Sequence, residues 1–345
     1  MHRRDGDVGA TTGFLPVQDP THPHDDPRGA ECNPVSVNLS TVDVSGPIQR
    51  GGRTSCAAPA GAPFGPFRLR HEKPFSRTFA NESGTAFLKE YRGITPSLRQ
   101  EREVIAMTRA GGLGVGVPQV LGAGATDSTV WTVFRHLPGH AGTVETRDGL
   151  RTFVQQVIEL GRRIHVAPPG TQPGAGWNRS ADDAPTHRDL LMCQFSAHAR
   201  AQPWWDDLHA ILGSLALGPV VYLHGDLKAE HFISSGDHVS VVDWEACARG
   251  PVACDHADAL FHTLRDLLYR AGSRRIQHDQ LERLQAPGPV MAWRLLLWLD
   301  RRPAPGLGAA SRRSLHQLMA EPKPTDVSRI AAHAITEAFE LGVPR

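Results

Sequence analysis

Short runs of alternating apolar and polar residues begin at residue 64. The first three runs cover 67–70, 77–81 and 85–91, and polar turns separate them, one of which contains Gly84. Alternation with a period of two is typical of β-strands that bury one face. The pattern therefore predicts a three-stranded antiparallel meander.

A helix with one apolar face is predicted over residues 97–110, because apolar side chains recur there at intervals of three and four. Ser97 is its predicted N-cap. Two further apolar runs, 117–121 and 130–134, predict strands. Residues 64–138 are thus expected to form a β-β-β-α-β-β lobe.

Helical periodicity dominates after residue 139. Its stripes predict helices over 150–166 and 204–217, with further helices to the end of the chain near Leu341. Short β elements interrupt this region, namely a strand at 220–223 and a hairpin formed by 232–234 and 239–242. The predicted fold class is therefore α+β, with a small antiparallel sheet lobe followed by a larger, mostly helical lobe over 139–345.

Residues 1–63 have a different composition. They are rich in Pro, Gly, Asp, His, Ser and Thr, and their isolated apolar residues are too few to offset the entropy of ordering the segment. We expect a disordered N-terminal extension ahead of the two lobes.

Overall charge excludes several classes of partner. Lys and Arg number 37 against 36 Asp and Glu, which does not fit a surface that neutralises many phosphates, so neither nucleic acid nor membrane is expected. No apolar run has the length of a signal peptide core or of a spanning helix. Five cysteines without a Cys-x-x-Cys pair fit a reducing compartment, and we expect a cytoplasmic protein.

The stretch from residue 220 to 245 carries the candidate chemistry. An apolar strand leads into His224 and Asp226, and a second apolar strand ends at Asp243. Phosphoryl transfer uses two such carboxylates, because one orients the attacking hydroxyl and the other holds the divalent cation at the nucleotide phosphates. Asp226 suits the first role and Asp243 the second.

This stretch resembles the catalytic segment of the aminoglycoside phosphotransferase and choline kinase group, within the protein-kinase-like superfamily. The pattern of that group is His-x-Asp-x-x-x-x-Asn followed by a strand ending in Asp. His224, Asp226 and Asp243 match it, whereas His231 stands in place of the Asn. Since the Asn is a metal ligand in the group, His231 is either a replacement ligand or a structural histidine. The resemblance implies a bilobal kinase-like fold that uses ATP with Mg²⁺, or with Mn²⁺.

The resemblance also implies partners in the first lobe. Lys89 occupies the place of the lysine that pairs with the α and β phosphates, and Glu103 that of its ion-pair partner, with Glu101 as the alternative. Lys89 and Lys228 are two of only four lysines in a chain that otherwise uses Arg. Lys228 either neutralises the transferred phosphoryl group or pairs with Glu230 at the surface.

Nucleotide contacts are implied at two further places. The phosphate loop of the group falls on residues 71–77, which contain no glycine, so Ser76 and the backbone up to Arg77 are expected to cap the phosphates. The adenine hinge falls on backbone groups from Arg135 to Leu137. Asp255 resembles the aspartate that braces the catalytic loop.

The implied activity is ATP-dependent transfer of a γ-phosphoryl group to a hydroxyl, but a fold does not reveal the acceptor. From Glu145 onward there are 22 Lys and Arg against 23 Asp and Glu, which argues against a polycationic aminoglycoside. The residues around Lys228 resemble the loop of protein Ser/Thr kinases, and residues 239–245 look like phosphotransferase-type proteins of peptide natural-product pathways, such as class V lanthipeptide synthesis. The preferred acceptor is therefore Ser or Thr of a ribosomally made precursor peptide, with a lyase as partner.

Two alternatives stay open. One is a small-molecule kinase of aminoglycoside phosphotransferase type. The other is a catalytically weak pseudokinase that acts as a nucleotide- or peptide-binding module, which His231 and the glycine-free loop would suit.

Overall fold

The computed structural model describes residues 62–93, 95–126, 129–166, 186–270, 276–302 and 312–340. All of them belong to one compact unit, Arg50–Arg345. The predicted N-terminal extension, apart from its last two residues, and the predicted helix end at Leu341 lie outside the described residues.

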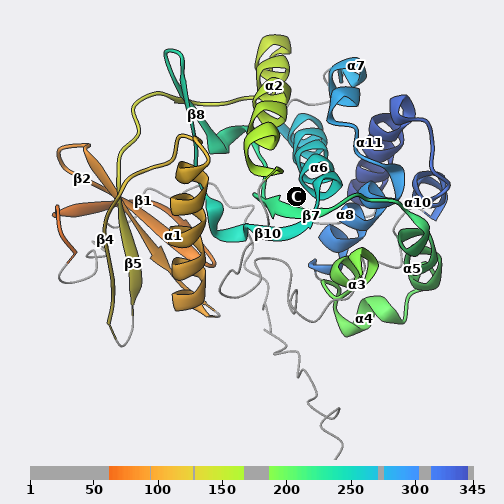
Figure 1. Ribbon diagram of the computed structural model, residues 1–345, viewed down its shortest axis with the longest axis horizontal. Helices are drawn as coiled ribbons and strands as arrows, with labels where there is room; N and C mark the ends of the chain where they lie inside the picture. The colour runs from red at the N-terminus through yellow and green to blue at the C-terminus, as the bar shows by residue number, and fades with distance from the viewer. Residues whose placement is uncertain are drawn as a thin grey trace, which may run out of the picture. The chain divides into compact units, whose positions relative to one another are not determined.

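A five-stranded antiparallel sheet forms the first part of this unit (Figure 1). Its order is β1-β2-β3-β5-β4, and its strands are β1 (Phe67–Lys73), β2 (Ser76–Asn81), β3 (Ala86–Tyr91), β4 (Val120–Ala125) and β5 (Val130–Arg135). The predicted meander is confirmed. In β3 both Leu88 and Lys89 are buried, and since successive side chains point to opposite faces, the lysine emerges on the face opposite Leu88.

Helix α1 (Pro96–Gly112) lies beside this sheet (Figure 1) and confirms the predicted helix. The predicted N-cap Ser97 is wrong, because Thr95 is the N-cap and Pro96 takes the first helical position. Proline favours that position, where its missing N–H would have no intrahelical partner. The strand expected at 117–121 is also displaced and begins at Val120 as β4.

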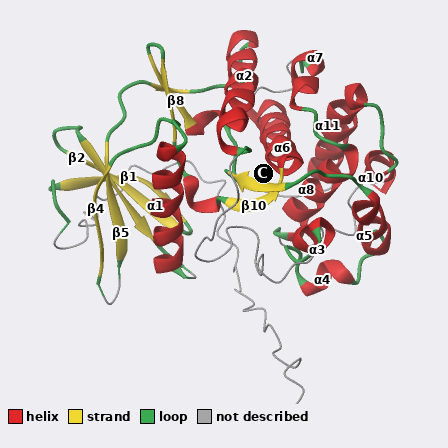
Figure 2. Ribbon diagram, viewed as in Figure 1, coloured by secondary structure: helices red, strands yellow, loops and turns green. Residues whose placement is uncertain are grey.

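Helices make up most of the second part (Figure 2). They are α2 (Arg147–Ile164), α3 (His187–Met192), α4 (Ala197–Arg200), α5 (Trp205–Ser214), α6 (Val252–Arg270), α7 (His278–Leu281), α8 (Gly288–Asp300), α10 (Arg312–Met319) and α11 (Pro324–Glu340), with short 3-10 turns at η2 (Ala229–His231), η3 (Trp244–Ala246) and η4 (Glu282–Leu284). The predicted helices correspond to α2 and α5, whereas the short α3 and α4 were not predicted.

Two small sheets lie among these helices. β7 (Val220–Leu223) pairs with β10 (Ala248–Pro251), while β6 (His140–Ala141), β8 (Phe232–Ser235) and β9 (His238–Val241) form the other sheet. The predicted strand and hairpin are confirmed as β7 and β8-β9, but β6 and β10 were not predicted. Pairing of Leu223 with Ala248 brings the segment after β7 close to the start of α6.

The main hydrophobic core lies among α2, α6 and α8 and continues into α1 through Ala106 and Met107. In α8 every residue from Gly288 to Leu299 is buried except Arg294. A half-buried arginine in such a helix needs a polar partner. Over the described residues, no helix combines the length and the apolar content that crossing a bilayer requires.

Candidate active site

The loop after β7 is clamped by two carboxylates of α6. Asp255 accepts hydrogen bonds from the backbone N–H groups of His224 and Gly225, at 3.0 and 2.9 Å. Asp258 accepts one from the N–H of Leu227 at 2.6 Å. Gly225 has φ 81°, a conformation that glycine adopts without the steric cost of a Cβ. The predicted bracing contact of Asp255 is thus present.

His224 connects this loop with the segment after β9. Its side chain is fully buried, and its Nε2 lies 3.1 Å from the carbonyl oxygen of Val242. Its Nδ1 accepts from the N–H of Asp226 at 3.3 Å. The imidazole therefore fixes the spacing between the loop that carries Asp226 and the backbone that leads into Asp243.

Asp226 has a cation on one carboxylate oxygen and an imidazole on the other. Lys228 Nζ lies 2.6 Å from Oδ2, and His262 Nε2 lies 3.1 Å from Oδ1. Burial alone would raise the pKa of Asp226, but His262 and Lys228 hold it well below its usual range. The carboxylate is thus ionised and able to accept a hydrogen bond from a hydroxyl. The ammonium of Lys228 thus lies at Asp226, on the side of the loop where the first of its two alternative roles would place it.

Lys89 is the centre of a buried ionic cluster. Its Nζ lies 2.7 Å from Asp243 Oδ1, 2.9 Å from Glu103 Oε2 and 3.2 Å from Glu245 Oε2. Burial lowers the pKa of Lys89, but Asp243 and Glu103 outweigh that effect and raise it well above its usual value. Glu101 is exposed, so the structure resolves the choice between the two glutamates in favour of Glu103.

Glu103 itself is held by two donors, since Tyr91 OH donates to the same Oε2 at 2.7 Å. Burial raises the pKa of Glu103 to about 7, with Asp243 and Glu245 adding to this effect and Lys89 opposing it. The pKa of this carboxyl therefore lies near neutral pH, well above that of an exposed glutamate.

Asp243 adopts a left-handed backbone conformation, with φ 62° and ψ 54°. This region is unfavourable for a residue with a Cβ, and such residues occur often at functional sites. Its Oδ2 lies 3.4 Å from His231 Nε2. Burial raises the pKa of Asp243, but Lys89 and His231 outweigh burial and hold it below its usual range.

Asp226, His231 and Asp243 form a group with the geometry of a cation site, because one ligand atom of each lies within 4.8 Å of the others. Burial lowers the pKa of His231, which keeps the imidazole neutral and a lone pair available. Its Nδ1 is buried, and no described residue provides it with a hydrogen-bond partner. Two carboxylates and one imidazole fit a divalent cation, and the nitrogen suits Mn²⁺ better than Mg²⁺.

The predicted phosphate loop is largely strand. β1 extends to Lys73, which pairs with Ser76, so only Pro74 and Phe75 form the turn. The extent predicted for the loop is therefore wrong, because strand pairing continues through residues that lack a turn signal. Ser76 is buried at the start of β2, and Arg77 Nε lies 2.8 Å from Glu72 Oε1.

The predicted adenine hinge follows β5. The N–H of Arg135 donates to Gln119 at 2.8 Å, and the N–H of His136 donates to Thr85 at 2.9 Å. Both amides are thus used within the lobe, whereas Leu137 lies beyond the last strand pair.

Comparison with known proteins identifies the type of enzyme. Residues 75–308 match the phosphotransferase enzyme family. The chain belongs to this family. The protein is accordingly an ATP-dependent phosphotransferase that acts on hydroxyl groups, and the predicted kinase-like α+β fold class is confirmed. No curated protein sequence matches the chain.

Three solved structures resemble the phosphotransferase. A choline/ethanolamine kinase family protein from Mesorhizobium loti is 18% identical, with 83% of this chain and 92% of that chain covered and a TM-score of 0.48. Aminoglycoside phosphotransferase APH(4)-Ia is 15% identical, with coverages of 81% and 94% and a TM-score of 0.48. Aminoglycoside phosphotransferase APH(3'')-Id from Streptomyces rimosus is 14% identical, with coverages of 65% and 92% and a TM-score of 0.42.

A pocket of about 230 Å³ opens beside Asp226 in the phosphotransferase. Its lining comes from the loop after β7, the segment after Asp243, α6 and α8, and consists of Gly225, Asp226, Ala246, Cys254, Asp258, Trp293, Arg294, Leu297 and Arg301. Arg294 Nε donates to Asp258 Oδ1 at 2.7 Å, and its guanidinium lies 3.1 Å from His262 Nε2. This contact explains the half-buried arginine of α8.

Sequence reasoning missed His262, Asp258 and Arg294 as parts of the site. A signal was available for the first two, because a spacing of four residues places them on one face of α6. For Arg294 the signal was a single charged residue inside the apolar run of α8.

Proposed function

We propose that this phosphotransferase transfers the γ-phosphoryl group of ATP to a hydroxyl of a small molecule that carries no net positive charge. The observation that supports this most directly is the ionised carboxylate of Asp226, which Lys228 and His262 hold at the wall of a pocket of about 230 Å³.

The two charges at the catalytic loop have separate roles in this proposal. Asp226 orients the acceptor hydroxyl and accepts its proton as the oxygen–phosphorus bond forms. Lys228, whose ammonium lies 2.6 Å from Asp226, stabilises negative charge on the phosphoryl group during transfer. His224 keeps the loop in place through its bonds to Val242 and Asp226.

Nucleotide binding is assigned to the cluster around Lys89. Lys89 positions the α and β phosphates, and Glu103 orients its ammonium. Asp243 and His231 hold Mg²⁺ or Mn²⁺, and the cation, when bound, neutralises charge on the phosphates. Asp226 is the third proposed ligand of this cation, and it lies on the side where the acceptor hydroxyl binds.

The remaining nucleotide contacts are proposed from position alone. The amides of Arg135 and His136 are already bonded, so we assign the hinge contact with adenine to Leu137 and to the carbonyl of Arg135. Ser76 and Arg77 stand at the turn between β1 and β2 and remain the proposed phosphate contacts of that turn.

The charge of the pocket supports the choice of acceptor. Its described lining holds two carboxylates, Asp226 and Asp258, and two guanidinium groups, Arg294 and Arg301. Asp258 is bonded to Arg294, and Asp226 to Lys228, so each carboxylate already has a cation within 2.7 Å. A polycationic acceptor gains little in such surroundings, whereas a neutral polyol or a hydroxycarboxylate meets no net repulsion.

The test is transfer of labelled phosphate from ATP to a panel of hydroxyl compounds, detected by mass spectrometry. The panel contains hydroxycarboxylates, neutral polyols, aminoglycosides and Ser/Thr peptides, and D226N is the inactive control. We expect transfer to the first two classes. Preferential transfer to an aminoglycoside would overturn the charge argument, and preferential transfer to a peptide would restore the precursor-peptide hypothesis. Lack of both transfer and ATPase activity in the wild type would favour the binding module.

A matched pair of arginines tests the pocket directly. Arg301 lines the pocket, whereas the neighbouring Arg302 stacks over Trp298 at 5.8 Å. R301Q is expected to raise KM for a hydroxycarboxylate and R302Q to leave it unchanged. Equal effects of the two substitutions would contradict the assignment of this pocket to the acceptor.

A further inference from the structure

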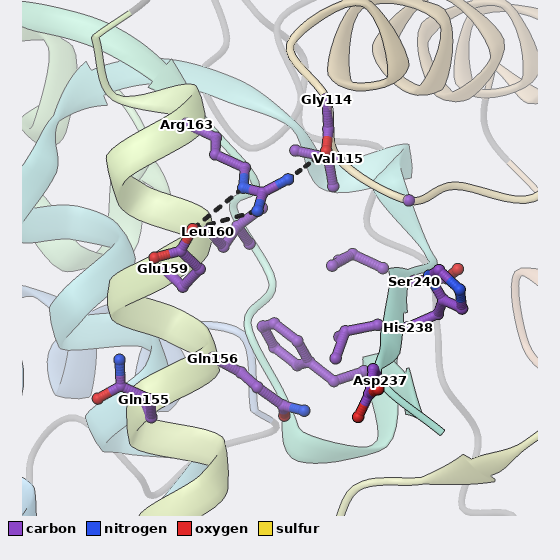
Figure 3. Close-up of a pocket in the computed structure, with 14 residues that line it drawn as sticks. Gly114, Val115, Gln155, Gln156, Glu159, Leu160, Arg163, Asp237, His238 and Ser240 are labelled. Atoms are coloured by element: carbon purple, nitrogen blue, oxygen red, sulfur yellow. Dashed lines mark hydrogen bonds and ion pairs between the residues drawn. The ribbon is translucent and has the colours of Figure 1, made fainter. Parts of the chain in front are cut away.

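A larger cavity, of about 750 Å³, lies between α2 and the β8-β9 hairpin (Figure 3). Three segments line it, and their residues are Gly114, Val115, Gly116, Gln155, Gln156, Glu159, Leu160, Arg163, Phe232, Asp237, His238, Val239, Ser240 and Val241. None of these is a residue assigned above to ATP, the cation or the acceptor. The cavity is therefore separate from the proposed active site.

Both lobes build this cavity. The loop after α1 supplies Gly114 to Gly116, while α2 and the hairpin supply the other walls. Figure 3 shows Arg163 reaching from α2 to the carbonyl of Gly114, with Glu159 on its other side. The N–H of Val241 donates to Gly116 O at 2.8 Å. A Cβ on Gly116 would lie 2.5 Å from Val239 O, so this close approach requires glycine.

The same three segments continue directly into the proposed nucleotide site. Phe232 follows His231, and Val241 precedes Val242 and Asp243. On the other side, α1 carries Glu103 and leads into the loop at Gly114. A ligand in the cavity would thus contact the backbone segments that position two groups of the proposed nucleotide site. These groups are Asp243, a proposed cation ligand, and Glu103, which pairs with Lys89.

The lining defines the chemistry of a ligand. Apolar side chains form much of the wall, namely Val115, Leu160, Phe232, Val239 and Val241. Among the described lining residues Arg163 is the one Lys or Arg, and it is paired with Glu159 at 3.2 Å. Gln156 donates to Ser234 Oγ at 3.2 Å and places its amide at the wall, where Ser240 adds a hydroxyl. The volume falls within the range of about 300–1,000 Å³ found for small-molecule sites.

We propose that this cavity is an effector site for an uncharged, largely apolar small molecule with one hydrogen-bonding group, and that its occupation strengthens nucleotide binding. The existence of the site stands on the cavity alone, whereas its effect on ATP rests on the proposed function. An anion would meet Glu159 and Asp237, and of these two carboxylates Glu159 is already paired with Arg163 and offers an organic cation little.

The coupling follows from where the walls come from. A ligand that contacts both the loop after α1 and the hairpin binds best when these two segments keep the relative positions that they have in this structure. In that arrangement Lys89 meets both Glu103 and Asp243. A ligand that binds this arrangement more tightly than other arrangements increases its population. The factor by which the effector strengthens ATP binding then equals the factor by which ATP strengthens effector binding.

The experiment uses the full chain and the uncharged dye Nile red as the probe. Dye fluorescence measures occupation of the cavity, and a fluorescent ATP analogue measures nucleotide affinity with and without the dye. The test variant is V239W, which fills the cavity from a side chain that is 37% exposed. The control is I105W, because Ile105 is also 37% exposed but lies on α1 outside the cavity lining.

We expect wild type and I105W to bind the dye saturably and to bind the ATP analogue about fivefold tighter or more in its presence. V239W is expected to lose both effects and to keep phosphotransfer. Unchanged dye binding in V239W would overturn the site, and dye binding without a change in nucleotide affinity would overturn the coupling. Because dye binding needs no turnover, an inactive wild type with intact coupling would refute the proposed function and leave the effector site standing.

Discussion

Lys89 Nζ and Asp243 Oδ1 lie 2.7 Å apart, although 154 positions separate the two residues in the chain. The same ammonium contacts Glu103 of α1 at 2.9 Å. A single buried cation thus joins β3, α1 and the segment after β9. Removing one member of such a buried group leaves its partners without compensation, which is costly in free energy.

Lys89→Met tests this junction. The substitution leaves Glu103 and Asp243 facing one another without the ammonium, while Glu245 keeps Arg99 at 2.8 Å. We expect it to lower the free energy of unfolding by about 3 kcal/mol and to abolish detectable saturation by ATP. Urea denaturation and steady-state kinetics measure the two effects. Lys323→Met is the control, because Lys323 is an exposed lysine. Indistinguishable K89M and K323M proteins would show that the cluster is dispensable.

His231→Asn tests the replacement of a family asparagine by histidine. If His231 is a ligand, the substitution removes the nitrogen that favours Mn²⁺, and we expect Mn²⁺ to bind about tenfold more weakly, since changes around a metal site commonly cost 10–100-fold. Mn²⁺ binding is read by electron paramagnetic resonance with a non-hydrolysable ATP analogue, independently of turnover. His238→Asn, an exposed position on the same hairpin, is the control. Unchanged Mn²⁺ affinity in H231N would make His231 a structural histidine.

Much of the fold follows from local pattern, as β2, β3 and the β8-β9 hairpin illustrate. The alternation of apolar and polar residues in these segments predicts strands without knowledge of which strands they pair with. β10 could not be found in this way, because Ala-Arg-Gly-Pro has no strand preference and becomes a strand only by pairing with β7. The predicted start of α1 was wrong because the N-cap is the residue that directly precedes the helical backbone, whatever its side chain. In the structure this residue is Thr95, whereas Ser97 lies inside the helix.

The candidate site divides in a similar way. His224, Asp226 and Asp243 lie in one linear motif, so sequence alone points to them. His262 and Arg294 reach the same place from two helices, and their convergence on Asp226 and Asp258 is a tertiary relationship without a linear signature. The sequence also left Glu101 and Glu103 undecided, because only packing of α1 against the sheet determines which of the two faces Lys89.

His262 is expected to act as a positioning residue for Asp226. Its Nε2 lies 3.1 Å from the carboxylate, so His262→Phe removes a donor and frees the carboxylate to turn. We expect kcat to fall by tenfold to about a hundredfold, because small misplacements of a catalytic group have effects of that order, while KM for ATP stays unchanged. His262→Gln, which keeps an N–H donor, should recover part of kcat. If misfolding alone lowered kcat, KM for ATP would change as well, and H262F and H262Q would show the same loss.

The control for this pair is His256→Gln, on the same helix. Burial lowers the pKa of His256 to about 4, and no contact with Asp226 is found for it among the described residues. Wild-type kcat in H256Q, together with reduced kcat in H262F, would support positioning. Equal losses of kcat in H256Q and H262F would mean that the effect comes from a disturbance of α6 and not from the contact with Asp226.

Glu103 makes the stability of the nucleotide-free protein depend on pH. Its pKa is about 7 in the folded state against an ordinary value of 4.5. The folded state therefore holds a proton that the unfolded state has lost between these values, so this residue contributes less stability as pH rises from 4.5 to 7. The full shift corresponds to at most about 3 kcal/mol. Asp243 and Asp226 act in the opposite direction, but only below their ordinary value of 3.8.

Urea denaturation between pH 5 and 8 of wild type, E103Q and E101Q isolates this contribution. Glutamine does not titrate, so the difference in unfolding free energy between wild type and E103Q is expected to decline as pH rises through that window. Glu101 is exposed on the same helix, and E101Q should follow the wild-type profile. Titration of the histidines, including His231, is common to all three proteins and cancels in the differences. Parallel profiles for E103Q and wild type would show that Glu103 keeps an ordinary pKa beside Lys89.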